Sequence, residues 1–292
     1  MSVLEVPAHA KINLSLDVLG KREDGYHDLR MIMQTIDLHD RILIEATDDA
    51  GITLECENNW IPMDSRNTVW KAARLLMEHC GIKSGLKINI KKRIPIAAGL
   101  AGGSTDAAAV LRGLNQLFFA GMELNELKDL GRQIGADVPY CIEGGTKLAE
   151  GIGDRLTPLW DFSGVDIVLV KPKIGVSTAW VYGNLKMAEI MQRDRPDTEV
   201  LISALTSGNI SMIAEHMKNV LELVTVPRHG IVQEAKDCLL KAGALGSMMS
   251  GSGPTVFGIF SDTSAAVRAY DDLVKDDRWQ CFLTKTCKIP QD

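Results

Sequence analysis

The stretch Ile96–Ala109, IAAGLAGGSTDAAA, places three glycines directly before an alanine-rich segment. Glycine has no Cβ and readily adopts positive φ, so backbone amides around Gly99, Gly102 and Gly103 can converge on an oxyanion. The first turn of a helix adds unpaired N–H groups and the positive end of the helix dipole. The stretch therefore predicts a phosphate-binding loop opening a helix that Ser104 or Thr105 caps. A strand-to-helix turn with glycines for tight packing is the alternative.

The loop differs from the common nucleotide-binding loops. The pattern G-x-x-x-x-G-K-[ST] needs a lysine before Ser104, where Gly103 stands, and GLAGGS does not form the dinucleotide pattern G-x-G-x-x-G. The H-R-D and D-F-G motifs of protein kinases are also missing from the sequence. We therefore expect a bound cation and the backbone amides, rather than a lysine of the loop, to balance the charge of a phosphate.

Composition restricts the class of protein. The 32 basic and 38 acidic residues give a net charge of −6 and a pI near 5.6, which argues against a general nucleic-acid binder. No apolar run approaches the ~18 residues that cross a bilayer, and the first ten residues do not form a signal peptide. The six cysteines are scattered without a C-x-x-C pair, which predicts reduced thiols rather than a zinc site. We expect a cytoplasmic protein with no nucleic-acid or membrane partner.

Hydrophobic periodicity predicts an α+β chain of two domains. In Ala10–Gly20 apolar residues alternate with polar ones, which predicts a half-buried strand with one polar face. Helices are expected over residues 67–80 and from Ser104 to about Phe119, a strand at 85–94 that Pro95 closes, and a turn at ADVPYCI (136–142). The apolar run VDIVLVKP (165–172) predicts a strand buried on both faces. The loop before it suggests domains of residues 1–160 and 161–292.

Several motifs together resemble a known family. PIAAGLAGGST (Pro95–Thr105) resembles the P-x-x-x-G-L-x-x-x-S-S ATP loop of the GHMP small-molecule kinases, the superfamily of galactokinase, homoserine kinase and mevalonate kinase. Three further segments resemble motifs of one family in it, the 4-diphosphocytidyl-2-C-methyl-D-erythritol kinases. These segments are PAHAKINLSLDVLGKREDGYHDL (Pro7–Leu29), GADVPYCIEGGTKLAEGIGD (Gly135–Asp154) and SGSGPTVFGIF (Ser250–Phe260).

The resemblance implies a fold and an activity. The fold would have two lobes, the N-terminal one like the second domain of ribosomal protein S5 and the C-terminal one ferredoxin-like, with the site between them. The activity would be phosphorylation, with ATP and Mg²⁺, of the 2-hydroxyl of the methylerythritol unit, a step of the non-mevalonate (MEP) route to isoprenoid precursors. The small-molecule substrate would be the cytidine-diphosphate compound, and the sequence does not choose between a monomer and a homodimer.

Two alternatives stand beside this interpretation. The first is a sibling kinase acting on homoserine or mevalonate, against which DGYH and GADVPYC favour the cytidine substrate. The second is a catalytically silent protein that binds RNA through its S5-like lobe. The acidic pI disfavours RNA binding, as does the presence of both Lys11 and Asp137.

The resemblance assigns the catalytic pair to Lys11 and Asp137. Asp137 would accept the proton of the attacking hydroxyl, and the Lys11 ammonium would keep that carboxylate ionised and lower the pKa of the hydroxyl. A solvated strand lysine and a turn-forming aspartate before Pro139 are the structural alternatives. The residues assigned to the ATP loop are Pro95, Ile96, Ala97, Ala98, Gly99, Leu100, Ala101, Gly102, Gly103, Ser104 and Thr105.

The resemblance also implies a substrate site. Asn13, which the strand period places on the same face as Lys11, would bind the erythritol hydroxyls. Tyr26 would stack on cytosine and His27 would read its polar edge, because stacking accepts any base while hydrogen bonds to the edge select one. Tyr182 would supply the opposite aromatic face, with Trp180 as the competing candidate.

Two features around the loop remain open at this stage. Asp106 either complements the helix dipole or, together with Ser104 or Thr105, approaches Mg²⁺. The turn Gly251–Ser252–Gly253 either packs beside the nucleotide loop or the substrate phosphates, or has a purely structural role.

Overall fold

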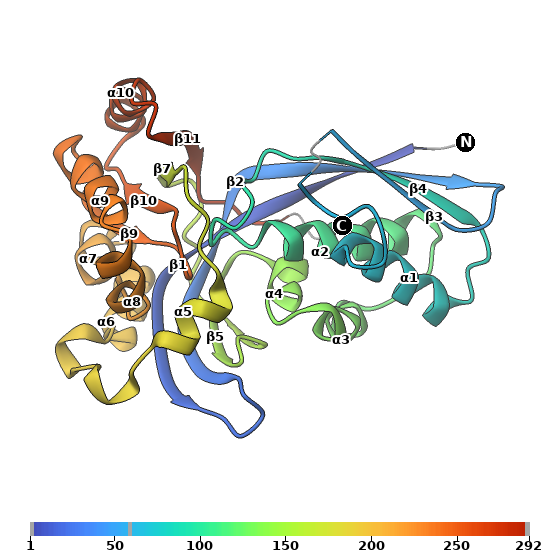
Figure 1. Ribbon diagram of the computed structural model, residues 1–292, viewed down its shortest axis with the longest axis horizontal. Helices are drawn as coiled ribbons and strands as arrows, with labels where there is room; N and C mark the ends of the chain where they lie inside the picture. Colours follow the sequence, from blue (N-terminus) through green and yellow to red (C-terminus); the bar gives the residue numbers. More distant parts are fainter. Residues whose placement is uncertain (1–2, 58–59, 290–292) are drawn as a thin grey trace.

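The computed structural model describes residues 3–57 and 60–289, and within these ranges the chain forms two β-sheets (Figure 1). The larger sheet has the order β3-β4-β2-β1-β8, with β5 paired to β2 and β6 to β5. Its strands are β1 (Val3–Lys21), β2 (His27–Thr47), β3 (Ile52–Cys56), β4 (Gly85–Lys91), β5 (Thr146–Gly151), β6 (Arg155–Pro158) and β8 (Lys218–Asn219). The smaller, antiparallel sheet has the order β11-β7-β10-β9, formed by β7 (Asp166–Pro172), β9 (Gly246–Met249), β10 (Val256–Ile259) and β11 (Trp279–Lys285).

The helices are divided between the two sheets. Those of the first half are α1 (Thr68–Cys80), α2 (Gly102–Leu117), α3 (Leu124–Ile134) and α4 (Val138–Glu143), and they gather on one side of the larger sheet (Figure 1). The second half contains α5 (Thr178–Asn184), α6 (Thr198–Thr206), α7 (Ile210–His216), α8 (Glu222–Arg228), α9 (Ile231–Lys241), α10 (Thr263–Leu273) and two 3₁₀ turns, η1 (Met187–Glu189) and η2 (Gln192–Asp194). Of these, α9 and α10 pack on the smaller sheet.

The arrangement confirms the predicted α+β fold of two lobes. The chain leaves the larger sheet after β6 and enters the smaller one at β7, and the expected domain boundary at residue 160 falls in this connection and stays a prediction. The lobes are also linked by later segments. The short strand β8 pairs with β1, and an isolated bridge joins Ile36 to Thr286.

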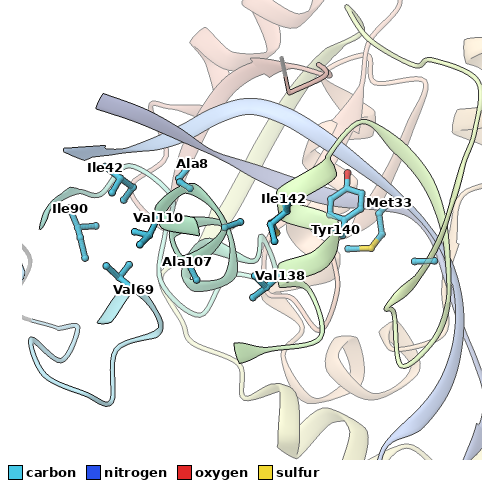
Figure 2. Packing of buried hydrophobic residues seen from close by; sticks show 14 of the residues in the cluster. Ala8, Met33, Ile42, Val69, Ile90, Ala107, Val110, Val138, Tyr140 and Ile142 are labelled. Atoms are coloured by element: carbon cyan, nitrogen blue, oxygen red, sulfur yellow. The ribbon is translucent and has the colours of Figure 1, made fainter. Parts of the chain in front are cut away.

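Apolar packing fixes the helices that carry the predicted site. Ala107 and Val110 of α2 are buried between the sheet and the neighbouring helices, because alanine lets the helix approach the strands closely (Figure 2). Tyr140 of α4 is buried beside Met33, and its hydroxyl donates to the Gly145 carbonyl at 2.7 Å and lies 3.0 Å from Thr35 Oγ1. The start of α4 is therefore held firmly against the sheet.

The long strand β1 changes its core-facing side twice. Ala8 and Leu16 belong to the core on the helix side of the larger sheet, whereas Ile12 and its neighbours Ala10 and Leu14 belong to the core shared with the C-terminal lobe. Register shifts between His9 and Lys11 and between Asn13 and Ser15 separate these segments. Each shift inserts a bulge that moves the side chains to the opposite face. The side chains of Lys11 and Asn13 thus point away from the core that Ile12 enters.

Three local predictions were wrong. Strand β1 is buried on both faces from Ala8 to Val18 rather than half-buried, because α2 and the C-terminal lobe cover it. The strand before the loop ends at Lys91, before Pro95. ADVPYCI forms helix α4 rather than a turn, with Pro139 in its first turn, where the missing N–H costs nothing.

Candidate active site

The glycine loop begins α2 earlier than predicted. The N-cap is Ala101, whose carbonyl accepts hydrogen bonds from the amides of Ser104 and Thr105 at 2.9 Å each, so neither of these residues caps the helix. Gly102 and Gly103 form the first turn instead, and the Thr105 hydroxyl donates to the His9 carbonyl. Ala101 has φ +59°, a left-handed conformation that is uncommon for a residue with a Cβ. Such conformations concentrate at functional loops.

The predicted loop residues differ in accessibility. Ala98, Leu100 and Thr105 are buried, so they can contribute to a phosphate site only through their backbone or by shaping the loop. The remaining predicted residues are exposed or half-buried: Pro95, Ile96, Ala97, Gly99, Ala101, Gly102, Gly103 and Ser104.

A turn of the C-terminal lobe locks the loop in place. Ser250 Oγ donates to the Gly99 carbonyl at 2.9 Å, and the Thr255 amide donates to the Ala98 carbonyl at 3.3 Å. Gly99 has φ +77°, and a Cβ there would lie 2.1 Å from the Ser250 carbonyl oxygen, so only glycine fits. The turn that contains Gly251–Gly253 therefore packs directly beside the loop.

Lys11 and Asn13 lie next to the same turn, Gly251–Gly253. Lys11 is 5 % exposed; its ammonium donates to Asn13 Oδ1 at 2.6 Å, and its backbone amide donates to the Leu100 carbonyl at 3.3 Å. A Cβ on Gly251 would lie 3.5 Å from Lys11 Nζ and 3.6 Å from Asn13 Oδ1. The strand β1, the loop and the turn thus converge at the junction of the two lobes.

Asn219 is a site residue that the sequence did not reveal. Its side-chain amide donates to the carbonyls of Met249 and Gly251, both at 2.8 Å, and so fixes the turn that faces Lys11. It lies in β8, which has only two residues between helices α7 and α8. So short a strand leaves no periodic signal in the sequence.

Asp137 stands at the N-cap position of α4 with its carboxylate free of any capping hydrogen bond. Burial raises the pKa of the nearby Cys141 thiol, the charge of Asp137 raises it further, and the charge of Lys11 lowers it. Burial also raises the pKa of Tyr182, and Asp137 adds to that effect. The charges of Lys11 and Asp137 therefore act on one small region, which Tyr182 borders.

The candidate cytosine-binding residues lie where the β1–β2 hairpin meets α5. The rings of His27 and Tyr182 are 5.1 Å apart and inclined by 36°, while Trp180 turns away to contact His229 at 6.2 Å. Tyr26 is 57 % exposed and borders a hollow of about 450 Å³. Burial, together with the charge of Lys21, lowers the pKa of His27, which keeps its ring neutral at pH 7. The hollow is lined by Arg22, Asp24, Tyr26, Asp28, Gly151, Ile152, Asp154 and Arg155.

A buried cluster of charged side chains lies next to the start of α2. The Lys92 ammonium contacts Asp40 and lies 2.8 Å from Asp106 Oδ2, and a Cβ on Gly102 would be 3.3 Å from it. Burial lowers the pKa of Lys92, but the charges of Asp106 and Asp40 outweigh that effect and raise it. Burial and the charge of Asp40 raise the pKa of Asp106, and the neighbouring Lys92 ammonium opposes this shift and favours the ionised carboxylate. Lys92 is thus a cation beside the loop that the motif comparison did not single out.

A basic hollow of about 660 Å³ opens next to Lys92. Its lining carries four cationic side chains and an exposed tryptophan, Trp60, and the sequence run KKR before Ile94 was the signal that could have pointed to it. The lining residues are Arg41, Cys56, Glu57, Trp60, Lys91, Lys92 and Arg93.

Comparison with known proteins agrees with this geometry. Residues 67–145 match the model described as "GHMP kinases N terminal domain", and residues 201–276 match "GHMP kinases C terminal". The 4-diphosphocytidyl-2-C-methyl-D-erythritol kinase of Acetivibrio thermocellus is 58 % identical over 286 residues, which cover 98 % of this chain and 100 % of that protein. The chain belongs to the 4-diphosphocytidyl-2-C-methyl-D-erythritol kinase family.

Two further relatives support this assignment. The Clostridium perfringens protein of the same name is 52 % identical over 284 residues, covering 97 % of this chain and 98 % of that protein. A crystal structure of a 4-(cytidine 5'-diphospho)-2C-methyl-D-erythritol kinase superposes with a TM-score of 0.82 at 32 % identity, covering 97 % of this chain and 99 % of the other. The family resemblance of the sequence motifs is thereby confirmed. In the described part of the chain, no helix is long and apolar enough to cross a membrane.

Removing the cation of the buried cluster should destabilise this family member. In Lys92→Met, Asp40 and Asp106 would remain buried side by side without a counter-charge, so we expect the free energy of unfolding to fall by about 3–5 kcal/mol. Urea unfolding of the wild type and the variant measures this. Lys91→Met at the exposed neighbouring position is the matched control and should stay near wild type. Equal stability of Lys92→Met and Lys91→Met would contradict the assigned role of Lys92.

Proposed function

We propose that the chain transfers the γ-phosphoryl group of ATP to the 2-hydroxyl of 4-diphosphocytidyl-2-C-methyl-D-erythritol, giving the 2-phosphate and ADP. The observation that carries the proposal is the convergence of the glycine loop, Lys11 and Asn13 at the lobe junction, in a chain whose relatives are named for this substrate. The reaction is a step of the MEP route to isoprenoid precursors. We place it in the cytoplasm, because six cysteines without a disulfide suit a reducing compartment.

In this proposal ATP binds with its phosphates at the loop from Pro95 to Thr105. The backbone amides at the start of α2 face the phosphates, and the helix dipole favours their negative charge. Lys92, held beneath Gly102 by two carboxylates, adds a fixed positive charge close to the loop. The basic hollow beside Lys92 is the space for the nucleoside, where the ring of Trp60 offers a stacking surface.

Mg²⁺ accompanies ATP in phosphoryl transfer and neutralises charge on the transferring group. Two oxygen donors near the start of α2 fit this ion, which prefers oxygen ligands. One is the hydroxyl of half-buried Ser104, and the other is Asp106 Oδ1, a buried oxygen without a hydrogen-bond partner in residues 3–57 and 60–289. Thr105 does not fit, because its hydroxyl is engaged with the His9 carbonyl.

Asp137 acts in the proposal as the base that accepts the proton of the 2-hydroxyl. Its carboxylate is free of capping hydrogen bonds and half-buried, so it is available to a substrate. The Lys11 ammonium stabilises the negative charge that develops as the hydroxyl attacks, and its hydrogen bond to Asn13 fixes its direction. Asn13 Nδ2 donates one N–H to Met31 Sδ at 3.3 Å, and in the proposal its second N–H binds the erythritol hydroxyls.

The cytidine end of the substrate lies in the proposal at the β1–β2 hairpin. Tyr26 and Tyr182 provide aromatic faces for the base, and neutral His27 hydrogen-bonds to its polar edge. Tyr182 is preferred to Trp180 because Tyr182 contacts His27, whereas Trp180 contacts His229.

A substrate panel tests the activity. The purified chain is incubated with Mg·ATP and, separately, with 4-diphosphocytidyl-2-C-methyl-D-erythritol, mevalonate and homoserine, and ADP release is followed. We expect turnover with the cytidine compound and at most traces with the other two. Absence of turnover with the cytidine compound, or faster turnover with either alternative, would exclude the proposed function.

Replacement of the proposed base should separate chemistry from binding. Asp137→Asn keeps the side-chain shape but cannot accept a proton, so kcat should fall by about 10²–10⁴-fold while ATP affinity stays close to wild type. Steady-state kinetics and ATP titration measure the two effects. Asp154→Asn, a change in the hollow near Tyr26 rather than at the lobe junction, is the control and should keep most of kcat. A fully active Asp137→Asn enzyme would mean that this carboxylate is not the base.

Loss of the proposed stacking surface should weaken substrate binding selectively. Tyr182→Leu removes the aromatic face, so KM for the cytidine substrate should rise about tenfold while KM for ATP is unchanged. Trp180→Leu, two residues earlier on α5, should leave both values near wild type. A larger effect from Trp180→Leu than from Tyr182→Leu would reverse the assignment of the two rings.

A further inference from the structure

A group of metal-ligand side chains lies beside the site and has no role in the proposed reaction. His9 belongs to β1, Asp37 and His39 belong to β2, and Cys287 follows the end of β11. His9 Nδ1 is 3.9 Å from Asp37 Oδ1 and 3.9 Å from Cys287 Sγ, and the ligand atoms of these three residues all lie within 4.8 Å of one another. The backbone of this cluster comes from two strands of the larger sheet and from the segment that follows the last strand of the smaller sheet.

We propose that His9, Asp37 and Cys287 form a binding site for a divalent cation of the zinc class, which accepts nitrogen, oxygen and sulfur ligands together. Around a tetrahedral zinc ion with Zn–N and Zn–O near 2.0 Å and Zn–S near 2.3 Å, ligand atoms are about 3.3–3.6 Å apart. The two separations from His9 Nδ1 are 3.9 Å and the third lies within 4.8 Å, so all three would shorten on binding to reach this geometry. Three protein ligands leave the fourth position for water.

The backbone holds the three ligands in position. The Cys287 amide donates to the Thr35 carbonyl at 2.9 Å, and Gln34 Nε2 donates to the Cys287 carbonyl at 3.1 Å, so the segment after β11 is fixed against β2. His9 is paired with His39 across the β1–β2 ladder. Little of the binding energy would therefore be lost in ordering the chain.

His39 flanks the three ligands. Its ring centroid is 5.0 Å from that of His9, and its Nδ1 lies 2.5 Å from the Asp37 carbonyl oxygen, a contact that orients the ring and leaves Nε2 open. Side chains that surround and orient metal ligands in this way commonly tune affinity. The Asp37 carboxylate is mostly exposed, which gives an ion from solvent a path to the buried His9.

Burial acts in opposite directions on two of the ligands, because it favours the neutral imidazole of His9 and disfavours the thiolate of Cys287. Burial and the charge of His39 lower the pKa of His9 to about 4, so its imidazole is neutral and available as a ligand. Burial and Asp37 raise the pKa of Cys287 to about 12. Binding would therefore break the S–H bond, form a metal–thiolate bond and release one proton to the buffer. The carboxylate and thiolate together neutralise the cation and outweigh the repulsion from Arg112, whose charge also reaches His9.

This ion differs from the Mg²⁺ of the kinase reaction. Mg²⁺ prefers oxygen ligands in octahedral geometry and has little affinity for a thiolate and an imidazole. Occupancy would join the C-terminal segment to β1 two residues before Lys11, and so would stabilise the contact between the lobes. The proposal is independent of the phosphoryl-transfer activity, because metal binding is measured without substrate.

Cobalt substitution tests the site. Tag-free full-length protein, treated with a chelator and then dialysed, is titrated with Co²⁺ and followed by absorption spectroscopy. We expect one ion per chain, intense tetrahedral d–d bands and a thiolate-to-cobalt charge-transfer band, all removed by adding Zn²⁺. Calorimetry in two buffers of different ionisation enthalpy should report release of one proton.

Variants distinguish this site from adventitious binding. Cys287→Ser should remove the charge-transfer band, and Asp37→Asn, a change at an exposed position that does not threaten folding, should weaken binding by about 100-fold. Cys238→Ser, at a half-buried cysteine of α9, is the matched control and should bind like wild type. Zinc should raise Tm in the wild type and in Cys238→Ser but not in Cys287→Ser. Absence of the charge-transfer band in the wild type, or a band that persists in Cys287→Ser, would overturn the proposal.

Discussion

The burial of a short polar segment between two hydrophobic cores is the constraint on which the rest of the site depends. Lys11 and Asn13 are almost fully buried, and a buried ammonium is costly unless it has polar partners. The bulges on either side of them send Ile12 into the core shared with the C-terminal lobe, so that these two polar side chains face the loop and the turn at Gly251 instead. Without the bulges, a regular β1 would keep all its alternating apolar residues on one face and could not contribute to both cores.

In the proposed function the loop meets a second constraint, since its backbone must stay open to phosphate while the C-terminal turn packs against it. The carbonyls of Ala98 and Gly99 are occupied by the C-terminal turn, which leaves the amides at the start of α2 without intrahelical partners. Lys92 places a positive charge next to the loop, and two carboxylates stabilise its buried ammonium. The loop therefore needs no lysine of its own, because Lys92, in the segment just before the loop, lies close to it in the folded chain.

Helices and strands whose sequence signals lie within a few residues were predicted well. The helix expected over residues 67–80 appears as α1, with Asn67 as its N-cap, and the buried run 165–172 appears as β7, because capping and burial on both faces leave local signatures. The start of α2 was misplaced, since Ser104 and Thr105 satisfy a capping pattern but Ala101 can adopt the left-handed conformation when the C-terminal turn fixes the loop. The positions of the bulges in β1 were not predictable, because they depend on a second core that includes distant residues such as Ile167 and Phe257. Asn219 escaped detection because the two-residue strand β8 leaves no periodic signal.

The cysteines show why a site built from residues far apart in the chain cannot be predicted from sequence spacing. The spacing of the cysteines gave no zinc motif, because spacing detects only ligands that share one local segment. His9 and Cys287 are separated by almost the whole chain, and they meet because β11 crosses to β2 at the Ile36–Thr286 bridge. The same crossing holds the smaller sheet against the strand pair that carries Lys11. The return of the C-terminal segment to β2 therefore has two structural consequences. It closes the second core beneath Ile12, and it completes the ligand set of the proposed cation site, which neither half of the chain contains alone.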